Sequence, residues 1–120
     1  MPRILIIEDE VVIAKVLKGY FSQHGLEVLT AATGEEGLAV LLSEKPSLVI
    51  LDMKLGEGLS GMEVLRRAKA AKSEADFIVV TAVDDQNVTD MAKGLGATDY
   101  ITKPVSTKDL ERVVLSRLKN

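Results

Sequence analysis

The sequence has no cysteine, no excess of basic charge and no long apolar run, and each absence excludes a class of function. Without cysteine the chain cannot form disulfides, thiolate metal sites or a cysteine nucleophile. The net charge is -3, so no basic field favours nucleic acid, and no direct nucleic-acid binding is expected. The first apolar run covers only residues 4–7 and is followed by acids, which is too short for a signal peptide or a membrane helix. We expect a cytoplasmic protein without membrane contact.

Length and composition predict one globular domain over residues 1–120. Hydrophobic residues make up 47% of the chain and charged residues 28%, which is typical of soluble globular proteins. No linker, low-complexity tract or internal repeat divides the sequence. Short apolar runs instead predict five strands, at residues 4–7, 27–30, 48–51, 77–80 and 100–102.

Segments with helical spacing separate these runs. On the first helix the spacing predicts an apolar stripe formed by Ile13, Val16, Leu17, Tyr20 and Phe21. Thr33, Ser60 and Ser106 stand at the expected starts of the second, third and fifth helices, where their hydroxyls can cap main-chain N–H groups. Gly25 and Gly96 can end the first and fourth helices in the left-handed conformation.

Five strand–helix units in succession predict an α/β fold with a parallel sheet. The strands are continuously apolar rather than alternating, which indicates helices on both faces of the sheet. We therefore expect a doubly wound, flavodoxin-like (βα)5 fold with strand order 2-1-3-4-5. This order places the carboxyl ends of the first and third strands side by side, where ligands bind in such folds.

Polar residues follow the strands at that edge of the sheet. Glu8 and Asp9 follow the first strand, Asp52 the third, Thr81 the fourth and Lys103 the fifth. Each alone has an ordinary structural explanation, such as a helix-dipole partner or a solvated loop charge. Together they form an acidic cluster that is costly unless a cation neutralises it. Hard oxygen ligands without histidine or thiolate suit Mg²⁺.

A Mg²⁺ ion beside a carboxylate suits phosphoryl transfer. The ion can bridge an incoming phosphoryl group while an oxygen of Asp52 attacks in line. Lys103 could pair with a phosphoryl oxygen, and the Thr81 hydroxyl could donate a hydrogen bond to another. The sequence thus suggests a phosphorylatable aspartate.

Four motifs, "ILIIEDE", "LVILDMKL", "VVTA" and "GATDYITKP", resemble the receiver domain of two-component response regulators over nearly the whole chain. The resemblance implies that Asp52 is the phosphoacceptor and Asp9 a direct Mg²⁺ ligand. Glu8 would act on the metal mostly through water, and the main-chain carbonyl of Lys54 would be a further ligand. The domain would promote its own phosphorylation and dephosphorylation without being an enzyme for other substrates.

The resemblance also implies a switch and partners. Thr81 would be the switch hydroxyl, Lys103 the phosphate-sensing cation and Tyr100 the switch aromatic, with a cis peptide bond before Pro104. The face formed by the fourth helix, fifth strand and fifth helix would change on phosphorylation and could mediate homodimer formation. The phosphoryl donor would be a phosphohistidine on a sensor histidine kinase or a histidine phosphotransfer protein. The first helix normally provides much of that partner contact.

The sequence departs from the family pattern after the acceptor. Many relatives have a proline four residues after the acceptor and a glycine eight after it, whereas this chain has Gly56 and then Gly61, so the loop is one residue longer. Lys54 and Val83 occupy the positions that tune the lifetime of the phosphoryl group. Neither side chain can align an attacking water, so we expect slow autodephosphorylation.

The sequence also predicts the positions of Gly94 and His24. Gly94 is expected inside the fourth helix, where a glycine weakens the helix by about 1 kcal/mol relative to alanine. His24, the only histidine, is expected to be a solvated cation at the end of the first helix rather than a phosphorelay residue.

Three other functions can be compared with the sequence. A haloacid-dehalogenase-type phosphatase would need an acid/base aspartate two residues after the nucleophile, where this chain has Lys54. A flavodoxin-like FMN carrier would need a first loop that attracts phosphate, and the acidic "EDE" repels it. A receiver-fold interaction module regulated without phosphorylation keeps every site residue, and only experiment separates it from a phosphoacceptor.

Overall fold

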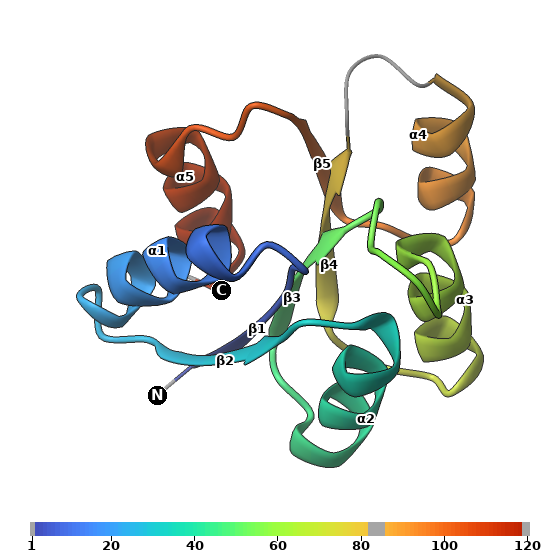
Figure 1. Ribbon diagram of the computed structural model, residues 1–120, viewed down its shortest axis with the longest axis horizontal. Coiled ribbons are helices and arrows are strands. Elements are labelled where there is room, and N and C mark those ends of the chain that lie inside the picture. Colours follow the sequence, from blue (N-terminus) through green and yellow to red (C-terminus); the bar gives the residue numbers. More distant parts are fainter. Residues whose placement is uncertain (1, 82–85, 119–120) are drawn as a thin grey trace.

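A computed structural model describes residues 2–81 and 86–118 (Figure 1). Within these ranges the chain forms five strands and five helices in strict alternation. Their bounds are β1 Arg3–Ile7, α1 Val11–Ser22, β2 Glu27–Ala31, α2 Gly34–Glu44, β3 Leu48–Asp52, α3 Gly61–Ala70, β4 Asp76–Thr81, α4 Gln86–Gly94, β5 Asp99–Thr102 and α5 Thr107–Leu118. All five predicted strands are present, and each is extended by one or two residues.

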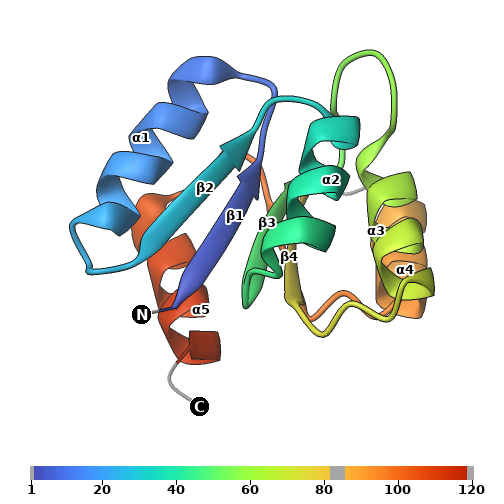
Figure 2. The same ribbon diagram turned by 90° about the horizontal axis from the view of Figure 1, so that it is seen from below.

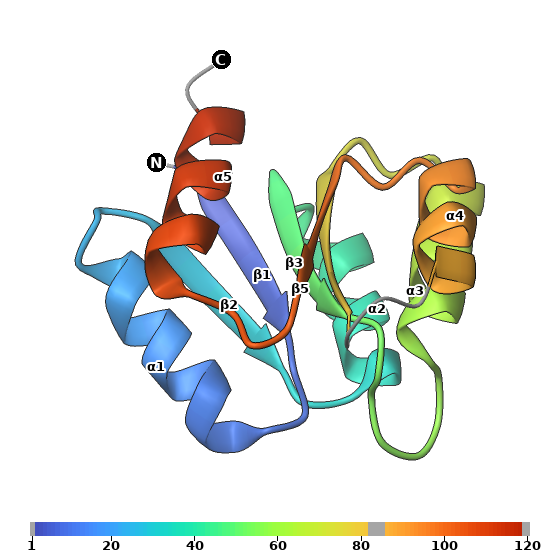
Figure 3. The same ribbon diagram turned by 90° about the horizontal axis from the view of Figure 1, so that it is seen from above.

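The sheet has the predicted topology. Every pair of neighbouring strands is parallel, and their order is β2-β1-β3-β4-β5. Helices α1 and α5 cover one face and α2, α3 and α4 the other, which Figures 2 and 3 show from opposite sides. The prediction of a doubly wound, flavodoxin-like (βα)5 fold is confirmed.

Alternate residues of the central strands fill a core on each face. Leu5 and Ile7 of β1 pack into the core beneath α2 and α3, whereas Ile4 and Ile6 pack beneath α1 and α5. All five residues of β3 are buried, as expected for a strand covered on both faces. The edge strands β2 and β5 are only partly buried. The central strands therefore give the site a rigid base.

All three predicted N-cap hydroxyls accept a hydrogen bond from a main-chain N–H, Ser106 from Asp109 at 3.4 Å. The Thr33 hydroxyl accepts from the Glu36 N–H at 3.1 Å, and the Ser60 hydroxyl accepts from the Glu63 N–H at the same distance. Gly25 and Gly96 both adopt the left-handed conformation, with φ of 80° and 93°. These turns let each helix return the chain to the next strand.

The structure adds detail to two of the predicted helices. The apolar stripe on α1 is only partly buried: Leu17 and Phe21 are buried, but Ile13 and Val16 are 41% and 56% exposed. The sheet and α5 cover only part of this helix, so its remaining apolar side chains face outward. Gly94 is the last residue of α4 rather than an interior one, because that helix ends before Gly96.

No helix in the two described ranges combines the length and apolar character that a membrane span requires.

Candidate functional site

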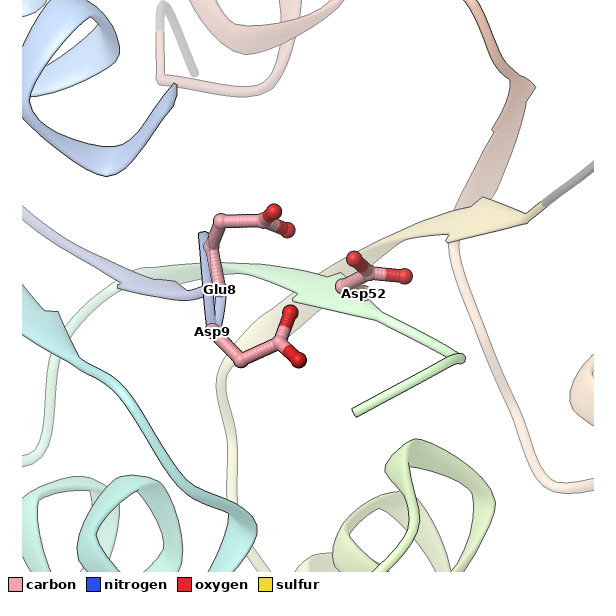
Figure 4. Close-up of side chains that lie close together, drawn as sticks. All are labelled: Glu8, Asp9 and Asp52. Atoms are coloured by element: carbon pink, nitrogen blue, oxygen red, sulfur yellow. The ribbon is translucent and has the colours of Figure 1, made fainter. Parts of the chain in front are cut away.

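The phosphoacceptor candidate lies at the end of the central strand. Asp52 is the last residue of β3, and its side chain is 2% exposed. The pairing of Ile7 with Leu51 brings the end of β1 level with the end of β3, so Glu8 and Asp9 emerge beside Asp52. Figure 4 shows the three carboxylates gathered there. The parallel register therefore assembles acids that are separated in sequence by more than forty residues.

The three acids form a group that could hold a metal ion. One carboxylate oxygen from each of Glu8, Asp9 and Asp52 lies within 4.8 Å of the others. Glu8 and Asp52 are buried, whereas Asp9 is exposed and opens the cluster toward solvent. Such a donor set, made of oxygen alone, fits a hard divalent cation with access from one side.

The electrostatics of Glu8 support this fit. Burial, together with the hydrogen bond and negative charge of Asp52, raises the pKa of Glu8 from 4.5 to about 8. The charge of Lys103 and the main-chain N–H of Glu10 oppose that rise in pKa. In the metal-free chain Glu8 is therefore mostly protonated at neutral pH, and a cation between the acids would displace this proton.

Both oxygens of Asp52 have partners. The Lys103 ammonium donates to Oδ2 at 2.9 Å, and the main-chain N–H of Lys54 donates to Oδ1 at 2.9 Å. Burial lowers the pKa of Lys103, but the hydrogen bond and charge of Asp52 outweigh it, so the net pKa is raised. Lys103 is thus a charged partner that fixes the orientation of the acceptor.

The ends of β4 and β5 complete the site. Thr81 is the last residue of β4 and is 3% exposed, and its carbonyl accepts from the N–H of Lys103 at 2.8 Å. The peptide bond between Lys103 and Pro104 is cis, as the resemblance implies. Val83, a predicted determinant of phosphoryl lifetime, lies outside the described residues.

Tyr100 lies on the exposed side of the edge strand β5. Its side chain is 44% exposed, and the Lys93 ammonium of α4 stands 4.7 Å from the ring centroid. The ring is therefore outside the core and holds a cation from the neighbouring helix. This position places Tyr100 on the face that the resemblance assigns to switching.

An apolar groove of about 630 Å³ leads from solvent to the acids. Val12, Ile13 and Val16 of α1 line one wall, and Val105 and Leu110 lie on the side of α5. Glu8, Asp52 and Lys103 also line it. The spacing of apolar residues along α1 gave no signal of this groove, because its shape depends on how α1 and the segment before α5 lie together.

The expectation for His24 needs a correction. It lies in the turn after α1 and is exposed, as expected, but its Nε2 is 2.7 Å from Oε2 of Glu111 on α5. The Tyr20 hydroxyl donates to the other oxygen of Glu111. His24 therefore pairs across two helices instead of contacting solvent alone, and spacing along one helix gave no signal of this contact.

Comparison with known proteins identifies a family. The model of the response regulator receiver domain matches residues 4–115. The probable transcriptional regulator ycf27 of Cyanophora paradoxa is 40% identical over 119 residues, covering 98% of this chain and 48% of that protein. Sporulation initiation phosphotransferase F of Bacillus subtilis is 32% identical over 112 residues, covering 93% of this chain and 90% of that protein.

Solved structures agree with this result. A CheY-like response regulator receiver domain protein from Methanospirillum hungatei JF-1 has a TM-score of 0.93 and 33% identity, covering 99% of this chain and 94% of that one. The chain spans about half the length of several curated relatives that it matches, which are named as transcriptional regulators. The chain belongs to the response regulator receiver domain family of two-component signalling.

Proposed function

We propose that the chain is a phosphoacceptor that receives a phosphoryl group on Asp52 and transmits a signal through its α4-β5-α5 face. The observation that carries this proposal is the buried Asp52 carboxylate, oriented by Lys103 at 2.9 Å and grouped with Glu8 and Asp9. A structural acid at a strand end would not need two further acids beside it, because clustered carboxylates repel one another.

The donor would be a phosphohistidine of a sensor histidine kinase or a histidine phosphotransfer protein. An oxygen of Asp52 attacks phosphorus, so an O–P bond forms while the P–N bond to the imidazole breaks. The electron pair of that bond returns to the imidazole nitrogen, which then takes a proton from solvent. Lys103 would pair with an oxygen of the transferred group, and the Thr81 hydroxyl would donate to another.

The acidic cluster would hold Mg²⁺. Asp9 and Asp52 would be direct ligands, Glu8 would act mainly through water, and the carbonyl of Lys54 would complete the protein's share. When bound, the ion neutralises the repulsion between the acceptor and the incoming phosphoryl group. The geometry supports this assignment, because one carboxylate oxygen from each of Glu8, Asp9 and Asp52 lies within 4.8 Å of the others.

The apolar groove beside α1 would be the docking surface for the phosphodonor, in the cytoplasm. Val12 is 74% exposed and Val16 is 56% exposed, and both line the groove that reaches Asp52. An apolar helix of the donor would cover them and bring its phosphohistidine to the acid. Lys15 and Lys18 are exposed on the same helix and would contact the rim of that interface.

Signalling requires that the phosphoryl group favours one conformation over another. Thr81 would move toward the phosphoryl group, and Tyr100 would turn into the space that Thr81 leaves. Lys93 would then lose the ring that it contacts at 4.7 Å, which would change the face used for output or homodimer formation.

The test is phosphorylation with a small donor. The chain is incubated with acetyl phosphate and Mg²⁺, and its intact mass is measured. We expect one added phosphoryl group in the wild type, none in Asp52→Ala, and none when EDTA removes the metal. Asp109→Ala, a change at an exposed acid on α5, serves as the matched control and should be modified like the wild type. An unmodified wild type would instead favour a receiver-fold module regulated without phosphorylation.

A further inference from the structure

The loop between β3 and α3 passes beside the acidic cluster. It follows Asp52 directly, and a Cβ atom placed on Gly56 would lie 3.4 Å from Oδ2 of Asp9. The loop also contains Lys54, whose N–H holds one oxygen of the acceptor. The path of this loop therefore determines where main-chain atoms lie relative to the acids.

The far end of the loop is attached to the start of α2. A carboxylate oxygen of Glu35 accepts from the main-chain N–H of Leu59 at 3.1 Å, across 24 residues of sequence. Figure 2 shows the loop beside the N-terminal end of α2. The two backbones are in contact there, since a Cβ atom on Gly34 would lie 2.4 Å from the carbonyl oxygen of Leu59. The attachment combines a hydrogen bond with close packing.

A glycine in the loop makes room for this carboxylate. Gly58 has a φ of 96°, and a Cβ atom there would lie 2.5 Å from an oxygen of Glu35. A side chain at position 58 would be strained by the backbone and blocked by the acid. The negative charge of Glu35 is also favoured in the first turn of α2, where main-chain N–H groups lack helical partners. Glu35 and Gly58 thus fit each other.

We propose that Glu35 is a positioning residue of the phosphorylation site. Its carboxylate anchors the lengthened loop on α2, and the anchored loop fixes the main chain of Lys54 and Gly56 beside the acids. The inference rests on the proposed function, because it concerns the affinity of the Mg²⁺ site and not the chemistry of Asp52. Mutation of a residue that hydrogen-bonds to a metal ligand typically weakens metal binding about 10–100-fold. Glu35 acts only through a loop, so we expect an effect at or below the lower end of that range.

The test compares two changes at one position. Glu35→Ala removes the acceptor oxygen, whereas Glu35→Gln keeps an acceptor oxygen and removes only the charge. Isothermal titration calorimetry with Mg²⁺ should give a Kd about 3–10-fold higher for Glu35→Ala, and a Kd within about twofold of the wild type for Glu35→Gln. Glu36→Gln is the matched control, because Glu36 lies in the same turn but its carboxylate accepts from Ala32 instead of the loop.

A second measurement separates positioning from general stability. With acetyl phosphate as donor, Glu35→Ala should need more Mg²⁺ for half-maximal phosphorylation, while the rate at saturating Mg²⁺ should match the wild type. A Kd unchanged in Glu35→Ala, or raised equally in Glu35→Gln, would overturn the inference. If the wild type binds Mg²⁺ but acetyl phosphate does not modify it, the proposed function is wrong. The comparison of Kd values between the variants would still test the role of Glu35.

Discussion

Gly61, the first residue of α3, packs directly on the backbone that carries the phosphoacceptor. A Cβ atom there would lie 2.4 Å from the main-chain oxygen of Asp52 and 2.6 Å from the Cα atom of Met53. Neither neighbour is a flexible side chain, so Gly61→Ala must shift the start of α3 or the end of β3. The required movement is about 1 Å, because unstrained contacts between non-bonded carbon atoms begin near 3.5 Å.

The expected sign is opposite to that of an ordinary glycine-to-alanine change in a helix. Overpacking of this kind typically costs about 1–3 kcal/mol, whereas alanine gains up to about 1 kcal/mol from helix propensity. A net loss of about 1–2 kcal/mol would lower the Tm by roughly 3–8 °C in a domain of this size. Gly19 lies inside α1, and apart from the backbone of that helix no described residue has an atom within 4 Å of its Cβ position, so Gly19→Ala should raise the Tm.

Thermal unfolding followed by circular dichroism measures both variants. The backbone displacement caused by Gly61→Ala affects the main chain of Asp52, so phosphorylation by acetyl phosphate should also slow. Gly19→Ala should leave the phosphorylation rate unchanged. A Tm of Gly61→Ala equal to or above that of the wild type would refute the close contact between α3 and β3 and the positioning argument built on it.

Three further predictions follow from the charges. The folded pKa of Glu8 is about 8 against 4.5 for an ordinary glutamate, so the folded state binds the proton more tightly. The Tm of the metal-free chain should therefore fall as pH rises from 4.5 to 8, and Glu8→Gln should flatten that dependence. The hydrogen bond from Tyr20 and the charge of His24 lower the pKa of Glu111, so Glu111→Gln should lower the Tm at pH 7, and the difference should shrink as pH falls below 4.5. Lys54→Asn should shorten the lifetime of the phosphorylated chain, measured by loss of the added mass with time. An equal or longer lifetime in the variant would contradict the role given to Lys54.

Much of the fold and of the site could be predicted because both depend on strands. Five apolar runs separated by helical segments leave few arrangements, and a parallel sheet brings the ends of its strands to one edge. For that reason Glu8, Asp9, Asp52 and Lys103 could be grouped without a structure. The N-caps at Thr33 and Ser60 could also be predicted, since they depend only on local sequence.

The remaining features depend on how surfaces meet. Ile13 belongs to an apolar stripe in sequence, but the width of the surface that covers α1 decides whether it is buried. The contact between Glu35 and Leu59 joins a helix start to an irregular loop, and no spacing rule relates them. The pKa of Glu8 depends on burial as well as on a neighbouring charge, and sequence supplied only the charge.

The central claim is that Asp52 carries the phosphoryl group. Borohydride reduces an acyl phosphate on aspartate to homoserine, so treatment of the phosphorylated chain followed by peptide mass spectrometry locates the modified residue. We expect homoserine at position 52, in a reaction that requires both acetyl phosphate and Mg²⁺. Homoserine at any other aspartate, or an unchanged residue 52 in a chain that has gained a phosphoryl group, would contradict it.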